Sequence, residues 1–548
     1  MPHNNILYIM FDQLRYDYLS CTGHPHLKTP HLDRLASKGL QFSHCYVQSP
    51  ICGPSRMSAY TGRYVHSHGS AWNNFPLKVG EQTMGDHLRE RGMDCWLVGK
   101  THMEVDQAGM DRLGIARDSV IGARVTECGF DVFERDDGLW GEGPAGRYDD
   151  KVSPYNAFLK SKGYTAENPW LHNANAGVDE DGDIASGWFM HNADKAANIA
   201  EEDSETPWLT GRAMDFVTKQ KSDGARPWLC HVSYIKPHWP YIVPAPYHDM
   251  YGPDDLKPVV RSDAEKSNPH PVYGAFMDNE VSRTFSRDEV RDRVLPAYMG
   301  LIKQADDQMG RLFDWLEAEG HMQDTLIVVT SDHGDYMGDH WMGEKDLFHD
   351  PSVRVPLIIY DPSPEADATR GTVCHELVES IDLAATFIDM AGDTPDHIIE
   401  GRSLRPFILG EKPDSWREFA VSEYDYSATP EANVLELTPK QARLFMLVDH
   451  DWKCVFADGG FRPMLFNLKD DPDELVDLGA DPACSDVIAM FRERLSQWAR
   501  RPSQRTTMPD DKLMAYRDLA PEPVGLFIGV WHEDDKPANT TAKARGKP

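Results

Sequence analysis

Two short apolar runs in this chain end abruptly in acidic residues. The first, Asn5 to Phe11, is followed by Asp12-Gln13, and the second, Thr325 to Thr330, leads through one serine to Asp332-His333. Uninterrupted apolar runs of this length are typical of buried parallel strands. Ligands of open α/β sheets bind beyond the carboxyl ends of such strands. We therefore expect the two acidic ends to converge on one metal site, although they lie far apart in the sequence.

Helical patterns and further apolar runs alternate between and around these two strands. Helices are expected at His31 to Lys38 and Val294 to Glu319, and strands at Cys95 to Val98, Trp228 to Tyr234 and Val355 to Tyr360. This alternation predicts an α/β fold with a mostly parallel central sheet covered by helices on both faces. Residues 105–206 are rich in Gly, Asp, Asn and Trp and show little periodicity, so we expect long inserted loops that shape a pocket.

The pattern changes after Pro413 to short strands joined by turns, followed by one helix. The strands are expected at Phe419 to Tyr424, Arg443 to Val448, Trp452 to Phe456 and Met464 to Asn467, and the helix at Ser485 to Ala499. Together they predict a small antiparallel sheet with one helix packed on it. We expect a catalytic domain over 1–413, a small subdomain over 414–501 and a C-terminal extension over 502–548.

The extension holds an apolar run, Gly525 to Trp531, beyond the small subdomain. An apolar segment in this place predicts packing on a partner subunit, and so a homo-oligomer such as a dimer or tetramer. The polar, Lys-rich residues at the end of the chain are expected to be disordered.

Charge and cysteine content narrow the class of protein. With 88 Asp and Glu against 56 Lys and Arg, the formal net charge is −32, which argues against nucleic acid or an anionic membrane as the main partner. No secretory leader pattern and no apolar run of membrane-spanning length is evident, so a cytoplasmic location is expected. The nine cysteines are scattered and form no CxxC pair, which suggests neither a disulfide scaffold nor a zinc site.

One pentamer is the strongest chemical signal. Cys52-Gly53-Pro54-Ser55-Arg56 has the form C-x-P-S-R, which average residue usage would produce by chance in roughly one chain in a thousand of this length. Taken alone, it could also be a small buried thiol before a helix. The pentamer resembles the sulfatase signature, whose cysteine a formylglycine-generating enzyme oxidises to formylglycine, an aldehyde whose hydrate is the catalytic nucleophile. This resemblance implies that Cys52 is the nucleophile, at the start of a helix capped near Ser55.

A second segment, Gly92 to His102, resembles the other sulfatase signature, G-x-x-T-x-x-x-G-K-x-H, with Cys95 in place of threonine. A strand that ends in G-K-x-H places the Lys100 cation and the His102 imidazole at the same sheet edge as the acidic residues. Such a pair suits the binding of a sulfuryl or phosphoryl oxygen and the transfer of a proton. By the resemblance, Lys100 holds a non-bridging oxygen and His102 is the candidate base.

Further resemblances complete the expected site. Asp12, Gln13, Asp332 and His333, with converted Cys52, match the family's metal-ligand positions. Three oxygen donors and one imidazole suit Ca²⁺ or Mn²⁺. Pro237 to Tyr241 and Gly343 to Phe348 resemble two family segments in which His238 would protonate the leaving alcohol and Lys345 would bind the anion. The remaining implied catalytic residue is Arg56, which would favour the ionised nucleophile.

The overall resemblance is to the sulfatase family of the alkaline phosphatase superfamily, and it implies an α/β/α sandwich. The stretch Gln48 to Gly92 is more similar to its phosphonate monoester hydrolase and phosphodiesterase branch, where Asn73 would line the pocket, whereas Lys100 and His102 match the arylsulfatases. We expect hydrolysis of small anionic esters: sulfate monoesters first, with overlapping phosphonate monoester and phosphodiester hydrolysis. The reverse order of preference is the alternative.

Two readings from other classes remain open. The chain could be a silent metal- and anion-binding protein whose Cys52 stays unconverted, although proton donors and acceptors would then have no purpose. It could also be a metal-dependent phosphotransferase related to the phosphoglycerate mutases. Those enzymes normally use a serine or threonine nucleophile and two metals, and the sequence shows ligands for one metal only.

Overall fold

The computed structural model describes residues 5–73, 75–138, 153–222 and 226–518. An eight-stranded sheet forms the centre, in the order β10-β2-β9-β8-β1-β7-β3-β4. β9 runs antiparallel to both its neighbours, and every other pairing is parallel. The predicted α/β class with a mostly parallel sheet is therefore confirmed. The strands are β1 (Asn5–Asp12), β2 (Leu40–Tyr46), β3 (Asp94–Gly99), β4 (Asp131–Arg135), β7 (Trp228–Pro237), β8 (Thr325–Ser331), β9 (Arg354–Tyr360) and β10 (Thr372–Glu379).

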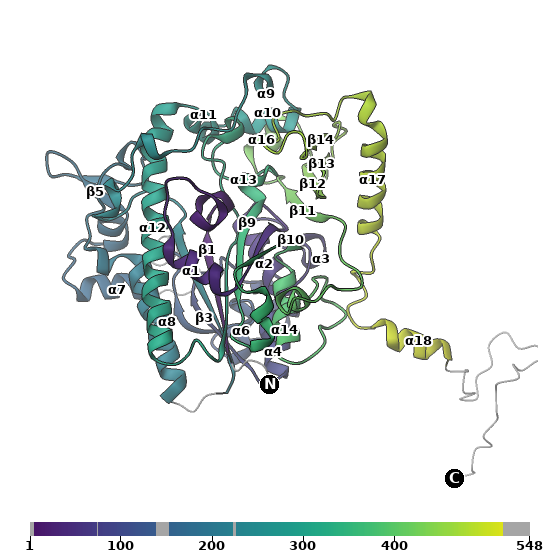
Figure 1. Cartoon of the computed structure of the whole chain (residues 1–548), viewed down its shortest axis with the longest axis horizontal. Coiled ribbons are helices and arrows are strands. Elements are labelled where there is room, and N and C mark those ends of the chain that lie inside the picture. Colours follow the sequence, from purple (N-terminus) through teal and green to yellow (C-terminus); the bar gives the residue numbers. More distant parts are fainter. Residues whose placement is uncertain (1–4, 74, 139–152, 223–225, 519–548) are drawn as a thin grey trace, which may run out of the picture.

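Helices cover both faces of this sheet, and β1 shows why (Figure 1). Its side chains alternate between the two faces, as in any strand. Ile6, Tyr8 and Met10 join one buried cluster and Leu7, Ile9 and Phe11 join the other. The first cluster includes helices α2 (Cys52–Thr61), α4 (Met84–Glu90) and α14 (Asp382–Met390), and the second includes α1 (Pro30–Lys38), α8 (Glu205–Ser222) and α12 (Asp288–Ala318).

Two expectations about this domain need correction. The helix expected from Val294 begins earlier, at Asp288, and continues through Pro296. Residues 105–206, which we expected to be long loops, contain short helices and strands in their described part. Each of these short elements needs only a few buried residues to pack on the rest of the domain. These elements are α5 (Gln107–Leu113), α6 (Val120–Thr126), strand β4, α7 (Pro154–Ser161) and the hairpin β5 (Ala176–Val178) and β6 (Ile184–Ser186).

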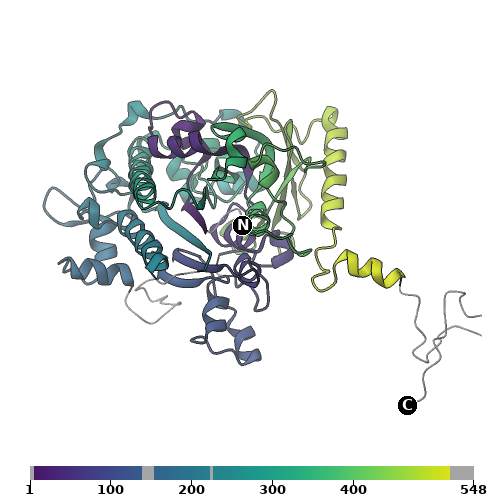
Figure 2. The same ribbon diagram turned by 60° about the horizontal axis from the view of Figure 1, so that its bottom comes forward.

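A second, four-stranded antiparallel sheet lies beside the first (Figure 2). It is built from β11 (Ala420–Asp425), β12 (Arg443–Val448), β13 (Trp452–Ala457) and β14 (Met464–Asn467), with α17 (Ser485–Ala499) packed on it through Phe491 and Trp498. Lys453 joins the two parts, because its ammonium donates to the carbonyl of Phe348 at 2.9 Å and to Asp350 at 2.7 Å. The predicted small sheet and its helix are present, whereas the domain boundary at 413 stays a prediction.

The remaining helices are short, and the last of them, α18, extends away from the rest of the protein after α17 (Figure 1). The apolar run Gly525 to Trp531, on which the oligomer prediction rests, lies outside the described residues. Among the helices described, none combines the length and apolar character needed to cross a bilayer. The remaining short helices are α3 (Val65–His68), α9 (Asp263–Ser267), α10 (Pro271–Met277), α11 (Glu280–Phe285), α13 (Asp350–Val353), α15 (Arg405–Ile408), α16 (Pro430–Val434) and α18 (Asp510–Asp518).

Candidate active site

Cys52 is the first residue of α2 and is 1% exposed. Its Sγ lies 2.9 Å from Nε2 of His333 and 3.9 Å from Oδ1 of Asp12. The helix cap expected near Ser55 is wrong: the residue before the helix is Ile51, and the Ser55 hydroxyl donates to the main-chain carbonyl of Asp332 at 2.5 Å. Ser55 thereby ties the helix to the end of β8.

Asn73 supplies the cap that α2 lacks. Its Oδ1 accepts a hydrogen bond from the main-chain N–H of Gly53 at 2.8 Å, one of the first-turn N–H groups that have no partner within a helix. A Cβ at position 53 would lie 2.9 Å from that oxygen, so the glycine of the pentamer permits this close approach. The structure thus places Asn73 beside the backbone of Cys52. Its expected contact with substrate stays a prediction.

The two acidic strand ends converge, as predicted from the apolar runs. β1 and β8 are parallel neighbours, with Phe11 opposite Ser331. The main-chain N–H of Gln13 donates to Oδ1 of Asp332 at 3.1 Å. Both carboxylates are almost completely removed from water, at 0% exposure for Asp12 and 1% for Asp332. Such burial requires compensating positive charge.

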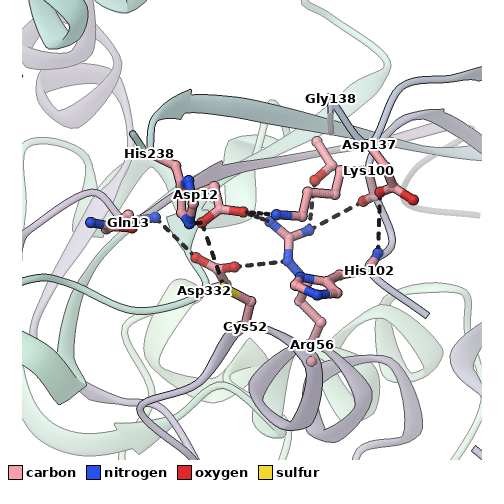
Figure 3. A network of polar contacts seen from close by, with 12 residues as sticks. Asp12, Gln13, Cys52, Arg56, Lys100, His102, Asp137, Gly138, His238 and Asp332 are labelled. Atoms are coloured by element: carbon pink, nitrogen blue, oxygen red, sulfur yellow. Dashed lines mark hydrogen bonds and ion pairs between the residues drawn. The ribbon is translucent and has the colours of Figure 1, made fainter. Parts of the chain in front are cut away.

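Arg56 and Lys100 supply this compensation from one side (Figure 3). Arg56 donates to Oδ2 of Asp332 at 2.8 Å and to Oδ2 of Asp12 at 3.2 Å, and Lys100 donates to Oδ2 of Asp12 at 2.5 Å. Burial favours the neutral acid, but the positive charges of Lys100 and Arg56 outweigh it and hold the pKa of Asp12 well below its usual range. The cations thus fix one oxygen of each carboxylate, and the other oxygen is directed toward Cys52 and His333.

These remaining atoms form a donor set that fits a divalent cation. One ligand atom each from Asp12, Cys52, Asp332 and His333 lies within 4.8 Å of the others. Nδ1 of His333 faces the carbonyl of Gly334 at 2.8 Å and must donate to it, which leaves the Nε2 lone pair for a metal. Burial disfavours a charged imidazole, yet Asp332 and Cys52 raise the pKa of His333 to about 9. The Asp332 carboxylate, which favours a proton on His333, also favours a metal cation beside it.

Gln13 lies at the border of this donor set. It has a left-handed backbone, with φ 67°, an unusual conformation that concentrates at functional sites. Its side-chain nitrogen donates to Tyr241 at 2.9 Å and also contacts Asp335, while its Oε1 accepts from Lys345 at 3.4 Å. Its role as a metal ligand stays a prediction, and Tyr241 and Asp335 are the residues that orient it.

His238 and Lys345 meet on the opposite side of Asp12 from Arg56. The Lys345 ammonium lies 3.2 Å from Nε2 of His238, and this Nε2 lies 4.0 Å from Oδ1 of Asp12. Nδ1 of His238 donates to the Trp239 carbonyl at 2.9 Å. Burial lowers the pKa of His238 well below its ordinary value, and Lys345 and Lys100 add to this effect although Asp12 opposes it. His238 is therefore neutral in the free site, with its proton on Nδ1.

His102 lies near Arg56 and Lys100 (Figure 3). Its main-chain N–H donates to Asp137 at 3.4 Å, and within the described part of the chain its Nδ1 is buried without a hydrogen-bond partner. Burial, followed by the charge of Lys100, lowers the pKa of His102 well below its ordinary value. A neutral imidazole can accept a proton, but the structure shows no contact between His102 and Cys52.

The structure therefore brings the expected residues together from the ends of four strands, β1, β3, β7 and β8, from helix α2 and, for Lys345, from the segment between β8 and α13, with His102 and Asn73 at the margins. Four further residues that contact the site escaped the sequence reasoning because their signals were short or ambiguous. Tyr241 ends the segment Pro237 to Tyr241 and donates to Asp335, which follows Asp332-His333 by two residues. Ser233 accepts from Arg56 at 2.7 Å, and Lys236 donates to the Pro240 carbonyl in the turn that carries His238. A polar residue inside an apolar strand, such as Ser233 or Lys236 in β7, is the signal that could have revealed the last two.

Comparison with known families gives two matches. A family model described as Sulfatase matches residues 4–393. A second, described as N-sulphoglucosamine sulphohydrolase, C-terminal, matches residues 338–501.

Individual relatives are similar over nearly the whole chain. The multifunctional alkaline phosphatase superfamily protein PehA of Trinickia caryophylli is 31% identical over 532 residues, covering 92% of this chain and 97% of its own. An arylsulfatase of Clostridium perfringens is 27% identical, covering 86% and 90%. Among solved structures, a phosphonate monoester hydrolase from Silicibacter pomeroyi superposes with a TM-score of 0.78 at 28% identity, covering 91% of this chain and 95% of that one.

Proposed function

Because the chain belongs to the sulfatase family of the alkaline phosphatase superfamily, we propose that it hydrolyses singly charged esters of sulfuric and phosphorus acids with converted Cys52 as its nucleophile. Ester hydrolysis of this kind is the activity that the family and its named relatives share. We infer the preferred ester and the catalytic role of each residue from the geometry of the site.

The position of Cys52 carries the proposal. Its side chain points from the first turn of a helix toward two carboxylates and an imidazole, and its Sγ lies 2.9 Å from His333. Helix N-termini favour negative charge, so an anionic oxygen at this position is stabilised from the helix side. When present, the formylglycine at position 52 supplies a nucleophilic oxygen, and a divalent ion held by Asp12, Asp332 and His333 supplies positive charge for the ester's non-bridging oxygens.

The leaving alcohol needs a proton, and His238, with Lys345 beside it, is the group that provides it. His238 is neutral in the free site, and its Nε2 accepts from Lys345 at 3.2 Å. An incoming ester adds negative charge beside the imidazole, which favours the protonated ring. The ring takes up this proton at Nε2 from solvent as the ester binds, and Nε2 then gives it to the departing oxygen. Lys345 keeps its own proton, because the negative charges around it outweigh burial and hold its pKa well above the ordinary value, and so it binds the anion as expected.

The remaining residues hold the substrate and complete the cycle. Lys100 is 5% exposed and faces Asp12, so its positive charge can attract a non-bridging oxygen at the same edge. His102, with its low pKa, is the base that removes a proton at position 52 when the inorganic anion leaves. Arg56 directs its donors to Asp12, Asp332 and Ser233, and so it acts by fixing the carboxylates.

A specific observation favours phosphonate monoesters as a second main substrate class. The phosphonate monoester hydrolases of Silicibacter pomeroyi and Agrobacterium radiobacter superpose with TM-scores of 0.78 and 0.76, each at 28% identity. Sulfate monoesters, phosphonate monoesters and phosphodiesters all carry one negative charge at neutral pH, so one cationic pocket can bind all three. The more highly charged phosphate monoesters should be poorer substrates.

The test joins a mass measurement to kinetics. Conversion of Cys52 lowers the mass of its peptide by about 18 Da, because a thiol carbon becomes an aldehyde. On the same preparation, kcat/KM is compared for an aryl sulfate, an aryl phosphonate monoester and an aryl phosphodiester that share one leaving group. Cys52→Ala should abolish turnover, whereas Cys484→Ala, at a partly exposed cysteine of the small subdomain, should not change it. Full activity of Cys52→Ala would exclude the proposal.

A further inference from the structure

Lys236 is a buried ammonium directly behind the His238 turn. It lies near the end of β7 and is 6% exposed. Its Nζ donates to Oδ1 of Asn175 at 3.1 Å, to the main-chain carbonyl of Pro240 at 3.0 Å and to that of His238 at 3.4 Å. An ammonium has three donors, and here each one has an oxygen partner. Two of the three partners are carbonyls of the turn that presents the His238 ring.

This turn has few other ways to hold its backbone. Pro237 and Pro240 lack an N–H, so they donate no main-chain hydrogen bond. His238 N–H bonds to the carbonyl of Ile235 at 3.1 Å, and the carbonyl of Pro240 also accepts from Ile242. Lys236 adds a charged donor that reaches both sides of the turn at once. Charge-assisted hydrogen bonds of this kind are roughly twice as strong as neutral ones.

The surroundings of Lys236 explain how a buried cation persists there. Glu205 and Asp136 are 5% and 4% exposed, and each has one oxygen without a hydrogen-bond partner among the described residues. Burial lowers the pKa of Lys236 to about 8, while the charges of Glu205, Asp12 and Asp136 oppose this effect. Asn175 belongs to the inserted segment and also donates to the Trp170 carbonyl at 3.1 Å, so Lys236 connects that segment to the turn.

The orientation of the His238 ring depends on this same backbone. Nδ1 of His238 donates to the Trp239 carbonyl, which lies between the two carbonyls that Lys236 binds, and the ring packs on the Trp239 indole with centroids 4.5 Å apart. A shift of the turn would therefore move Nε2 relative to Lys345 and Asp12. Misplacing a reacting group by about 1 Å can cost 10²-fold in rate.

We propose that Lys236 is a positioning residue: it holds the His238 turn in the geometry that protonates the departing alcohol, and its loss acts on catalysis through His238. This inference rests on the function proposed above for His238. It does not require Lys236 to touch the substrate.

The experiment compares leaving groups in the converted, metal-loaded enzyme. Two esters of the same acid are used, one with 4-nitrophenol and one with an unsubstituted phenol, because only the poorer leaving group depends strongly on a proton donor. In Lys236→Met, kcat/KM for the phenyl ester should fall roughly 10²-fold, with the loss mainly in kcat, while the 4-nitrophenyl ester changes much less. Lys453→Met is the matched control, since this wholly buried lysine serves the contact between the two sheets; it should leave the ratio between the two esters unchanged.

A double-mutant cycle separates positioning from a general structural effect. The double variant Lys236→Met/His238→Ala should be no slower on the phenyl ester than His238→Ala alone, because two groups that act as one unit are not additive. Additive losses, or an equal loss on both esters in Lys236→Met, would overturn the inference. If Lys236→Met does not fold, Asn175→Ala is the decisive variant, because it removes one of the three acceptors of Lys236. It should change the ratio between the two esters in the same direction by a smaller factor.

The same data separate the inference from its premise. A His238→Ala enzyme that loses both esters equally would remove the role of His238 and with it the basis for Lys236. A His238→Ala enzyme that loses the phenyl ester selectively, combined with an unchanged ratio in Lys236→Met, would leave the proposed function standing and refute the positioning role alone.

Discussion

Replacing Arg56 by methionine tests how the site holds its two carboxylates. The guanidinium is completely buried between Asp12 and Asp332 and also donates to Ser233 at 2.7 Å. Methionine keeps most of the apolar stem but removes the charge and all the donors. The variant therefore leaves buried negative charge with less compensation and changes little else in the packing.

The size of the effect follows from the contacts. Removing one partner of a buried ion pair costs about 3–5 kcal/mol, since an uncompensated charge stays buried. Lys100 also donates to Asp12, at 2.5 Å, so the loss falls mainly on Asp332. We predict that Arg56→Met lowers the free energy of unfolding of the metal-free protein by about 3–5 kcal/mol and not by twice that amount. Added Ca²⁺ or Mn²⁺ should restore part of the loss, because it neutralises the same carboxylates.

Denaturant unfolding followed by tryptophan fluorescence, with and without divalent ion, measures both effects. Arg500→Met is the control: its guanidinium is 69% exposed and lies 3.6 Å from Glu493, so its removal should change stability by less than about 1 kcal/mol. A metal-free Arg56→Met protein as stable as the unchanged one would refute the reasoning. So would a divalent ion that stabilises the variant less than it stabilises the unchanged protein.

Three further outcomes are expected. A divalent ion at 100 times its Kd should raise the free energy of unfolding by about 2.7 kcal/mol, and Asp332→Asn should remove that gain; equal gains would contradict the assigned ligand set. Burial raises the pKa of Asp306 to about 7, so stability should fall as pH rises from about 4 to about 7, by at most roughly 1.4 kcal/mol per pH unit from this group. Asp306→Asn should flatten that slope in denaturant titrations, and an unchanged slope would contradict this origin. Because every residue of α2 is buried, a formylglycine-generating enzyme should convert Cys52 in the unfolded chain but not in the folded protein; peptide masses showing equal conversion would disprove this.

The strands that position the metal ligands could be predicted from sequence because they are buried on both faces. Continuous apolar runs at Asn5 and Thr325 marked β1 and β8, which lie side by side in the sheet. β2 was missed, since Leu40–Tyr46 contains Gln41, Ser43 and His44, and β10 was missed because its first half, Thr372 to Glu376, is largely exposed. β10 is the edge strand of the sheet and β2 lies beside it. Exposure removes the apolar signal of β10, whereas β2 is buried and only its polar side chains hide it.

The residues of the site were predictable where a motif names them, but their hydrogen bonds were not. Ser55 illustrates the limit: a serine in the first turn of a helix suggests a cap, yet its hydroxyl binds the Asp332 carbonyl while Asn73 caps the helix from another segment. Sequence spacing describes neighbours within one element, whereas these bonds join residues about 20 and 277 positions apart. Contacts of this kind follow only from the assembled sheet edge.

The contacts of the site residues indicate where substrate preference should arise. Two carboxylates and two cations of the site bind one another: Asp12, Asp332, Arg56 and Lys100. Mutual charge compensation determines their geometry, so these residues can vary little between enzymes of different substrate specificity. His238 differs, because its ring rests on Trp239 and its turn on Lys236, which in turn binds Asn175 of the inserted segment. Changes in that segment can move the proton donor relative to the leaving oxygen without disturbing the carboxylates. The choice between sulfate and phosphonate esters should therefore respond more to substitutions around residues 170–205 than to those at the metal ligands.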